Sequence, residues 1–360
     1  MPKTFRNLWP QLVSFENLLA AYRAARRGKR GSSQVARFEL RCEEHLLRLQ
    51  DELQSGRYRP GAYHTFVVYE PKRRVISAAP FRDRVVHHAL CQVIEPIWEA
   101  RFHGRSYACR RGRGTHRALD VAQHYIRGHR YVLRCDVEQF FPSIDHEVLK
   151  CQLARHIADT RVLDLIDRIL AGGAHLLRDE YRMVYFPGDD LFAPLRPRGL
   201  PIGNLTSQFW ANVVLHDLDM FVAHELRCNA YVRYCDDFLL FADDATTLLR
   251  WRAAIIECLA GLRLTLHETR AQVAATAAGV PFLGWTVFPF RRRLRKRNVL
   301  HFRRRWRKLC AGYAAGATTF ARLSASAKGW AAHAANGNTT GLRRSLFGQI
   351  VPPRISMSHS

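Results

Sequence analysis

The chain has 360 residues, 48% of them hydrophobic and 24% charged, so it can bury a core and is not a disordered tail. Lys and Arg number 56 against 31 Asp and Glu, a net charge of +25, and the best source of compensating charge is a nucleic-acid backbone. The sequence has no apolar run of about 18 residues and its start lacks a signal-peptide pattern, so we expect a cytoplasmic protein without membrane contact. Its nine cysteines form no CxxC pair, which leaves oxygen as the expected ligand for any metal.

Residues 1–60 show helical spacing of apolar residues and predict an N-terminal helical extension. Residues 62–78 alternate and are rich in β-formers, which predicts a hairpin with residues 70–73 at its tip. A helix is expected from about Asp83 to Trp98. A strand at 131–141 is expected to break at Pro142.

A helix should follow that strand, with Ser143 or Asp145 as its cap. The Gly/Pro-broken loop 199–208 leads into a helix at 209–222, and residues 231–244 read as two short apolar strands around an acidic pair. The composition then changes at Arg291, because residues 291–308 hold eleven Lys or Arg in eighteen positions and no acid. These patterns predict an α+β protein with an extension at 1–60, a mixed block at 61–290 and a basic helical part at 291–360.

Adjacent aspartates occur at 189–190, 236–237 and 243–244. The first pair follows Pro187–Gly188 in a loop and the third ends a strand, so we expect both at the surface. Asp236 and Asp237 instead lie between two apolar runs. Burying two carboxylates there is costly unless a cation compensates them. A plain polar hairpin turn is the alternative reading.

A third carboxylate on a neighbouring strand would complete a metal site. Asp136 is the best candidate, because it ends an apolar strand, and Glu138 is its rival at a spacing of two on the same face. Three such oxygens suit a pair of Mg²⁺ ions, with Mn²⁺ as a possible substitute. Two ions of this kind can activate a 3′-hydroxyl and stabilise a pyrophosphate leaving group.

The order of motifs along the chain resembles that of the reverse transcriptases. YCDD at 234–237 resembles the family's Tyr-x-Asp-Asp, and similar segments follow the family order at 71–77, 79–87, 135–146, 199–208 and 282–285. The resemblance implies a right-hand polymerase fold with fingers, palm and a helical thumb, and an RNA-directed DNA polymerase activity. The sequence LPIGNLTSQ within the loop 199–208 is most similar to the diversity-generating retroelement branch, whose enzymes copy a template-repeat RNA into adenine-mutagenised cDNA.

The resemblance also implies roles for individual residues around the acids. Asp136, Asp236 and Asp237 resemble the metal-binding triad, with the Val137 carbonyl as a further ligand. The other residues are implied to contact the incoming nucleotide. Lys72 and Arg74 would grip its triphosphate, Phe141 would act as the gate at its sugar, and Tyr234 with Cys235 would lie beside that sugar.

Other residues are implied to contact the nucleic-acid strands. Arg82 is expected to face the template, and Gly284 with Trp285 resembles the primer grip, although plain core packing is the alternative for this Trp. The basic segment 291–308 resembles a thumb that tracks a backbone, with Arg303, Arg304, Arg305 and Trp306 as the expected contacts.

Two positions depart from the family pattern. Ile202 replaces a polar residue, so a hydrogen bond to the nucleotide is lost and base pairs should be checked less strictly, which in the family goes with errors opposite template adenine. Arg270 lies where relatives tend to place a Lys thought to protonate pyrophosphate. An Arg pKa is too high for an efficient acid, so Arg270 is expected to stabilise charge instead.

The family also implies partners: template RNA, a cDNA or primer strand, dNTPs and a small basic accessory variability protein. We expect no RNase H, integrase or HNH-type endonuclease domain. Two alternatives remain at this point. One is a group II intron or retron-type reverse transcriptase of ordinary fidelity, and the other is a non-catalytic RNA-binding protein on a polymerase fold.

Overall fold

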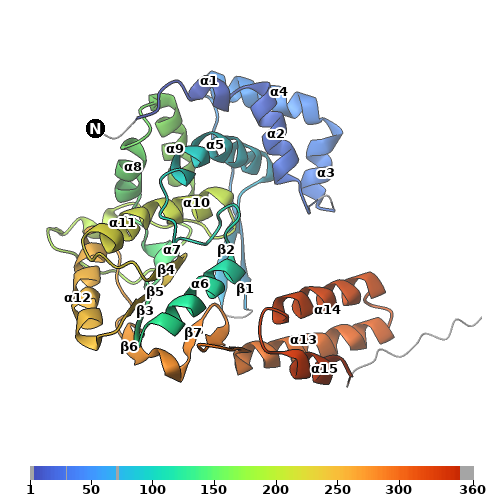
Figure 1. Cartoon of the computed structure of the whole chain (residues 1–360). Helices are drawn as coiled ribbons and strands as arrows, with labels where there is room; N and C mark the ends of the chain where they lie inside the picture. Colours follow the sequence, from blue (N-terminus) through green and yellow to red (C-terminus); the bar gives the residue numbers. More distant parts are fainter. Residues whose placement is uncertain (1–3, 30, 70–72, 349–360) are drawn as a thin grey trace, which may run out of the picture.

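The computed structural model describes residues 4–29, 31–69 and 73–348. Its N-terminal part is helical, as the sequence predicts, and packs at the top of the molecule in Figure 1. The Ser14 side chain caps the second of these helices by accepting a hydrogen bond from the Asn17 amide at 3.2 Å. The helices are α1 (Trp9–Leu12), α2 (Phe15–Ala25), α3 (Ser33–Leu40) and α4 (Cys42–Gln54).

The long helix α5 (Phe81–Glu99) joins this N-terminal part to the rest of the chain. It covers the expected span of 83–98 and buries residues on all sides, because α2 and α10 (Leu205–Val214) both pack against it. The main hydrophobic core therefore takes residues from the N-terminal helices as well as from the central sheet and its helices, while α6 (Thr115–Gly128) packs in a second cluster. The extension 1–60 and the mixed block share one core.

The expected hairpin is formed by β1 (His64–Val68) and β2 (Arg74–Ala78), which pair antiparallel from His64 opposite Ala78 to Val68 opposite Arg74. Its predicted tip at 70–73 lies mostly outside the described residues. In Figure 1 the hairpin extends from the helical part toward the C-terminal helices.

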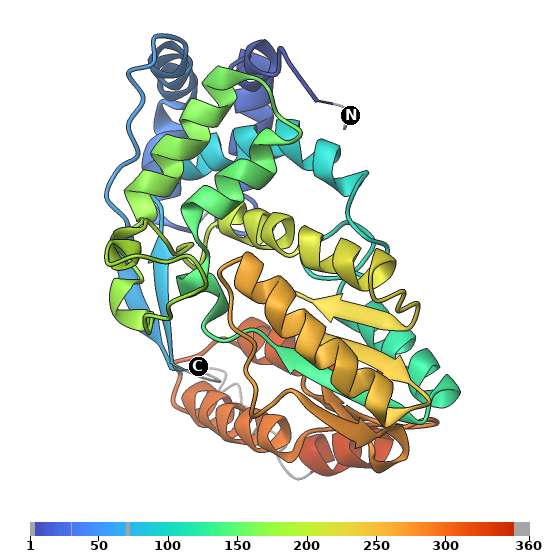
Figure 2. The same cartoon turned by 90° about the vertical axis from the view of Figure 1, so that its left-hand side faces the viewer.

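The central sheet is antiparallel and has the order β4-β5-β3-β6. Its two faces are both covered, since α12 (Ala245–Gly261) packs on one face and α6 (Thr115–Gly128) on the other (Figure 2). This explains why the run at 238–241 is apolar at every position instead of alternating. The strands are β3 (Tyr131–Asp136), β4 (Tyr231–Tyr234), β5 (Asp237–Ala242) and β6 (Gln272–Ala275).

Two predicted boundaries differ from the structure. The strand expected at 131–141 ends at Asp136. Pro142 lies inside the single helical turn α7 (Phe140–Ser143), which is so short that the proline ring interrupts no helical hydrogen-bond ladder. Asp145, not Ser143, caps α8 (His146–Ala154), because its carboxylate accepts hydrogen bonds from the first amides of that helix.

The helix expected at 209–222 is two helices. α10 begins earlier, at Leu205, and α11 (His216–His224) continues after a break at Leu215. Between α8 and α10 the chain forms α9 (Thr160–Gly173) and then an irregular segment, 174–204, with two short 3₁₀ turns, η1 (Arg178–Glu180) and η2 (Ala193–Leu195).

A second, three-stranded sheet follows β6 and the 3₁₀ turn η3 (Thr276–Ala278). It consists of β7 (Val280–Phe282), β8 (Trp285–Val287) and β9 (Arg292–Leu294) in that order. The boundary that composition suggests near 290 thus falls inside a sheet, because β9 carries basic residues and still pairs with β8.

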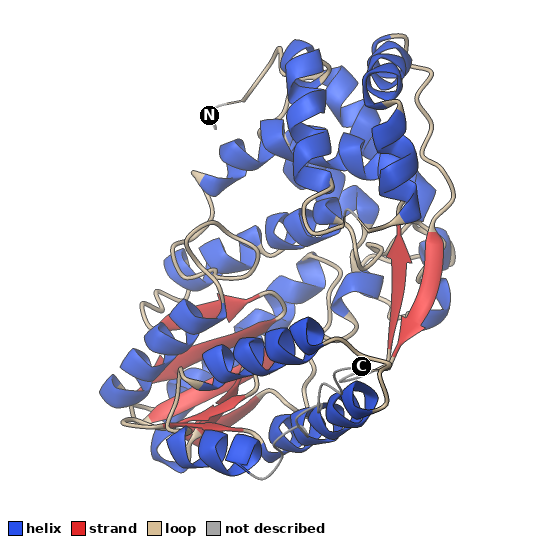
Figure 3. Cartoon of the chain, turned by 90° about the vertical axis from the view of Figure 1, so that its right-hand side faces the viewer, coloured by secondary structure: helices blue, strands red, loops and turns tan. Residues whose placement is uncertain are grey.

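The C-terminal part consists of α13 (Lys296–Ala314), α14 (Phe320–Ala334) and α15 (Thr340–Gly348), which pack on one another beside the sheets (Figure 3). They enclose a small core of their own, in which Phe302 stacks on Trp330 with ring centroids 4.3 Å apart. Over the described residues, none of the helices combines the length and the apolar character that a bilayer crossing requires.

Candidate active site

The acidic pair lies in the tight turn that joins two buried strands of the central sheet. Tyr234 pairs with Asp237 across the two-residue turn formed by Cys235 and Asp236. Cys235 has φ +58°, a left-handed conformation that costs a non-glycine residue about 1–2 kcal/mol. On the other side of β5, Asp136 lies directly opposite Asp237. The register therefore brings the three predicted aspartates together.

Glu138 is not part of this arrangement. The β3–β5 ladder ends with the pair Asp136–Asp237, and Glu138 lies beyond it, exposed, with its amide bonded to the Thr265 carbonyl. Val137 follows Asp136 directly, is buried, and donates its amide to the Asp236 carbonyl at 3.2 Å. This bond ties the end of β3 to the acidic turn.

The carboxylates of this group oppose one another's ionisation. Burial raises the pKa of Asp236, and the charge of Asp136 raises it further. Burial also raises the pKa of Asp237 to about 7, against the opposing effect of Arg134, whose Nε lies 3.5 Å from its Oδ1. A bound cation would relieve both burial and repulsion.

Arg270 holds the third carboxylate. It lies just before β6, and its Nη1 donates to Oδ2 of Asp136 at 2.6 Å. With Asp136 engaged in this way, no three His, Cys, Asp or Glu side chains of the described residues already converge as a metal site. The donor set nevertheless fits a hard divalent cation, because it offers carboxylate oxygens at the rim of a part-buried turn. In this structure the charge of Arg270 is paired with Asp136, and its role at the leaving pyrophosphate stays a prediction.

A buried ion pair supports the turn from below, and sequence reasoning missed it. Arg233 and Asp219 are both fully buried, with Nε of the Arg 2.7 Å from Oδ1 of the Asp. Arg233 Nη1 also donates to the Cys235 carbonyl at 3.1 Å, while Tyr231 donates to Asp219 at 2.8 Å. Although burial alone would lower it, the ion pair holds the pKa of Arg233 above its usual value. An Arg inside an apolar strand is the signal that could have indicated this pair.

The residues expected at the nucleotide approach the acids from the hairpin and from the loop before α10. Arg74 begins β2 and is exposed, and its positive charge partly offsets the rise in the pKa of Asp236, so it lies in the neighbourhood of the acidic turn. Lys72 lies outside the described residues. Ile202 is half-buried, and its carbonyl accepts a hydrogen bond from the Ser77 amide at 3.0 Å, which fixes this loop to β2.

Two aromatic residues expected near the sugar of the nucleotide lie at the ends of the central strands, Phe141 after β3 and Tyr234 at the end of β4. Phe141 is half-buried in the turn α7, packs against the main core, and its carbonyl accepts from the Leu200 amide at 2.9 Å. Tyr234 accepts a hydrogen bond from the Thr115 hydroxyl at 3.1 Å, which orients its ring against the start of α6. Their roles at the nucleotide stay predictions.

Arg82 does not point freely toward a template strand. Its guanidinium forms an ion pair with Glu52 of α4 and lies over the Tyr58 ring at 5.3 Å. The N-terminal extension thus supplies a carboxylate partner that the local sequence around Arg82 does not show, and the template contact of Arg82 stays a prediction.

Trp285 and Trp306 are corrected, since both are core residues. Trp285 is 0% exposed in the second core cluster, and Trp306 is 4% exposed and packs edge-on against Phe347. Neither indole can contact a strand directly. Gly284 has φ +85°, which requires glycine, and its carbonyl accepts from Asn298 at 3.1 Å, which fixes β8 to the start of α13.

The basic residues of α13 do face outward. Arg304 and Arg305 are exposed and Arg303 is half-buried. Because Phe302 and Trp306 turn inward on the same helix, the Arg residues between them are directed to the opposite side.

The other two acidic pairs play structural roles. Asp189 was expected at the surface, but Arg263 binds both of its oxygens, at 2.6 and 2.9 Å, and covers its side chain. Asp243 accepts the Arg130 amide at 2.9 Å, and Asp244 caps α12. The last pair is at the surface, as predicted.

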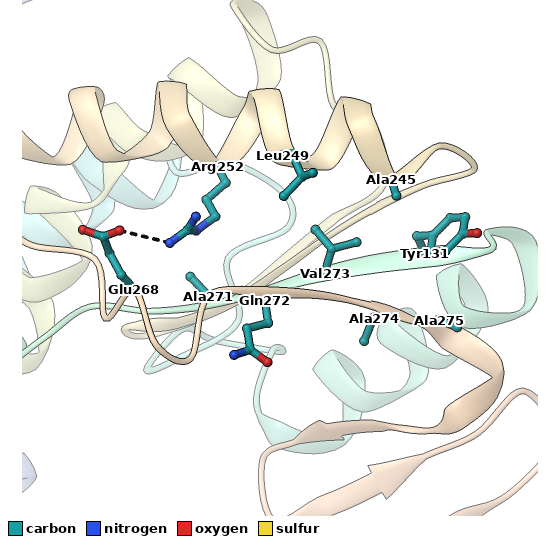
Figure 4. Close-up of a pocket in the computed structure, with 10 residues that line it drawn as sticks. All are labelled: Tyr131, Ala245, Leu249, Arg252, Glu268, Ala271, Gln272, Val273, Ala274 and Ala275. Atoms are coloured by element: carbon teal, nitrogen blue, oxygen red, sulfur yellow. Dashed lines mark hydrogen bonds and ion pairs between the residues drawn. The ribbon is translucent and has the colours of Figure 1, made fainter.

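A hollow of about 600 Å³ lies between α12 and the edge strand β6. Figure 4 shows its walls, where Arg252 and Glu268 form an ion pair at 3.0 Å and small side chains such as Ala271 and Ala274 line the strand. None of the predicted site residues lines it, so this hollow does not mark the site of the aspartates.

Residues 69–287 match the family model of the reverse transcriptases, the RNA-dependent DNA polymerases. This match covers more than half of the chain and contains the three aspartates, the hairpin strand β2 and the loop before α10. The chain belongs to the reverse transcriptase family. The part around the central sheet accordingly corresponds to the palm of a right-hand polymerase fold, and β2 of the hairpin lies within the match. α13–α15 lie outside the matched residues, so their role as a thumb stays a prediction.

Several curated proteins are similar to this reverse transcriptase. Protein YkfC of Escherichia coli strain K12 is 28% identical over 308 residues, which cover 73% of this chain and 76% of YkfC. The group II intron-encoded protein LtrA of Lactococcus lactis is 27% identical over 50% of this chain and 28% of LtrA. Nuclear intron maturase 2 of Arabidopsis thaliana is 29% identical over 47% of this chain and 25% of its own length. The chain thus spans about a quarter of each of the two intron proteins.

Some solved structures of telomerases show a weak similarity to the fold of this chain. A Candida albicans telomerase with a fragment of telomeric RNA gives a TM-score of 0.42 at 11% identity, over 70% of this chain and 51% of that one. A truncated Candida tropicalis telomerase gives 0.46 at 10% identity, over 68% and 58%. The family assignment rests on the sequence match.

Proposed function

We propose that this reverse transcriptase is the RNA-directed DNA polymerase of a diversity-generating retroelement, which copies a template-repeat RNA into cDNA with errors concentrated at template adenines. The observation that carries the polymerase part is the strand register, which sets Asp136 directly opposite Asp237 and places Asp236 in the adjoining turn at one end of the central sheet. The branch is supported by the loop sequence LPIGNLTSQ, in which Ile202 offers no polar side chain to the nucleotide.

Asp136, Asp236 and Asp237 would hold Mg²⁺, or Mn²⁺ as a substitute, with the Val137 carbonyl nearby. The ions, when bound, would supply activation of the primer 3′-hydroxyl and charge stabilisation of the leaving pyrophosphate. This chain's own residues would orient the reactants: Arg74 supplies positive charge near Asp236 from the hairpin, and Arg270 offers positive charge at Asp136. The proposed partners are template RNA, a primer or cDNA strand, dNTPs and a small basic accessory protein.

A second candidate function is that of an intron-type reverse transcriptase of ordinary fidelity. Similarity to LtrA and to an intron maturase favours it. The two functions differ in the error spectrum of the cDNA.

Primer extension on an RNA template, followed by sequencing of the cDNA, distinguishes the two. We expect Mg²⁺-dependent synthesis by the parent protein with errors at template adenines, no synthesis by Asp236→Asn, and RNA binding close to normal in that variant. The accessory protein and its cognate RNA are added in a parallel reaction. Synthesis retained by Asp236→Asn would overturn the site, and faithful cDNA would favour the intron-type function.

Ile202→Gln tests the fidelity argument in the same assay. Restoring a polar side chain should lower the error rate opposite adenine and leave synthesis on other template bases unchanged. An unaltered error spectrum would show that Ile202 does not determine fidelity.

A further inference from the structure

A cavity of about 200 Å³ lies where the N-terminal extension, α5 and the start of α10 meet. It is separate from the aspartates, and none of its lining residues belongs to the predicted catalytic site. Lys29 reaches it from the turn after α2, and Arg84, His87 and His88 reach it from α5. The three α5 residues are spaced i, i+3 and i+4, so they lie on one face of that helix.

The cavity concentrates basic groups without a carboxylate to balance them. Within the described part of the chain, no acidic side chain contributes to the pKa of Lys29, Arg84, His87 or His88. Burial lowers the pKa of Arg84, and partial desolvation of the ammonium group together with the charge of Arg84 lowers that of Lys29, although the residue as a whole is exposed. Like charges gathered in this way favour an anionic ligand.

His87 is the second, independent observation. It is 1% exposed, and neither of its ring nitrogens has a hydrogen-bond partner among the described residues. Burial lowers the pKa of His87 to about 3, so the ring is neutral at neutral pH and offers one N–H and one acceptor nitrogen. A buried polar group left unpaired costs about 1–3 kcal/mol. A ligand in the cavity would supply the missing partner.

The N-terminus of α10 forms another wall. The Asn204 side chain does not cap this ten-residue helix, because it is used to accept from the Ala79 amide at 3.1 Å and to donate to the Ser77 carbonyl at 2.8 Å. Asn204 and Leu205 line the cavity, so the start of an uncapped helix adjoins it. Amide groups and the helix dipole at such an end favour negative charge.

We propose that this cavity binds a phosphate group, held by Lys29, Arg84, His87 and the start of α10. The source that fits best is the backbone of the RNA strand, since the loop that forms one wall also carries Ile202, which the proposed function places beside the pairing bases. The assignment to RNA rests on the proposed function, whereas the phosphate chemistry does not.

The test uses the full chain and two variants, Lys29→Ala and His87→Leu, with Arg27→Ala as a charge-matched control in the same turn. Thermal unfolding is followed with inorganic phosphate and with chloride at equal ionic strength. Phosphate should raise the Tm of the parent and of Arg27→Ala, and should not raise it in the two cavity variants. Because Lys29 is exposed, its variant should fold even if His87→Leu does not.

The second arm measures fluorescence anisotropy of a labelled single-stranded RNA over a range of salt. Lys29→Ala should reduce the slope of log K against log salt by about 0.7, the value for one phosphate contact on a single strand. His87→Leu should weaken binding roughly two- to tenfold, as expected for one lost hydrogen bond.

Each outcome decides one part of the proposal. If phosphate raises the Tm only where the cavity is intact, while both variants bind RNA like the parent, the cavity takes a free anion and the RNA source is overturned. If phosphate has no specific effect on the parent, the phosphate site is overturned. Neither result bears on Asp236→Asn, which tests the polymerase proposal separately.

Discussion

Asp237 lies between two other carboxylates in a part-buried turn, and its ionisation therefore opposes folding. Its pKa of about 7 is above the ordinary 3.8, which means that the folded chain binds this proton more tightly than the unfolded chain. The contribution of this protonation to folding stability is fully present below pH 3.8 and is lost as the pH rises through 7. At alkaline pH the charged carboxylate then costs at most about 4 kcal/mol.

Asp237→Asn should consequently stabilise the metal-free protein while abolishing synthesis. We expect a higher Tm than that of the parent at pH 8, and a difference that disappears toward pH 4, measured by thermal unfolding in EDTA. Mg²⁺ should stabilise the parent more than the variant. A variant that is less stable than the parent at pH 8 would show that the carboxylate is compensated by other groups.

Arg270 competes with a cation for Asp136. The ion pair is half-exposed, so it is expected to contribute no more than about 1 kcal/mol. Arg270→Ala should therefore lower the Mg²⁺ concentration for half-maximal synthesis up to about fivefold. It should also lower kcat, because a positive charge near the leaving pyrophosphate is lost.

A Mg²⁺ titration of primer extension measures both quantities. Arg252→Ala serves as the control, since it removes a neighbouring Arg paired with Glu268 instead of Asp136. An unchanged Mg²⁺ requirement in Arg270→Ala would mean that the Arg270–Asp136 pair does not form in solution.

At the scale of elements, the geometry of the acidic turn depends on α11, the helix that precedes β4 in the chain. Asp219 of α11 holds Arg233 of β4, and Arg233 holds the Cys235 carbonyl. This contact keeps a left-handed Cys235 in place, so the geometry of the turn is set by the packing of α11 beneath the sheet.

Removing one partner of this buried pair should be far more costly than removing both. Asp219→Ala should destabilise the protein by about 3–5 kcal/mol, because Arg233 remains buried without a counter-charge. The double variant Asp219→Leu with Arg233→Met should recover much of that stability and still synthesise poorly, since the Cys235 carbonyl is no longer held. Urea unfolding and primer extension measure the two effects, and full activity in the double variant would contradict the positioning role.

The segment 174–204 shows a similar dependence on distant partners. Arg263, just after α12, binds Asp189 at 2.6 Å and Asp145 at 3.1 Å, and Arg196 binds Asp145 at 2.6 Å. These contacts fix a long irregular loop to two palm helices. The acidic pair at 189–190 looked like an ordinary surface turn because its Arg partner is far away in the sequence.

At the scale of the whole molecule, residues 291–308 hold eleven of the 56 Lys and Arg and no acid, at the start of the proposed thumb. The residues of α13 divide into two classes, with Arg304 and Arg305 outside and Trp306 inside. Arg304→Ala and Arg305→Ala should each reduce the salt slope of RNA–DNA binding by about 0.7–0.9 and leave stability nearly unchanged.

Trp306→Ala should instead cost about 3–5 kcal/mol of thumb stability, because it empties the small core of α13–α15. Binding isotherms at several salt concentrations, together with thermal unfolding, separate the two classes. A variant of Trp306 that is stable but defective in binding would restore this residue as a direct contact.

The sequence by itself predicted the α+β architecture, the hairpin, the helix near 83–98 and the family, because these depend on local periodicity and on motifs of fixed order. It also predicted that Asp136, Asp236 and Asp237 belong together, since strand ends and a tight turn limit where such carboxylates can lie. Both the architecture and the family are confirmed, whereas the roles at the nucleotide and the retroelement branch stay predictions.

Only the tertiary structure decided which partner each side chain meets. Arg82 pairs with Glu52 and Arg270 with Asp136, across separations of 30 and 134 residues. Trp285 and Trp306 are buried by elements from other parts of the chain, which no local pattern around them shows. Charge and apolar surface are properties of a residue, but ion pairing and burial belong to the folded chain, and the fold alone brings such distant groups together.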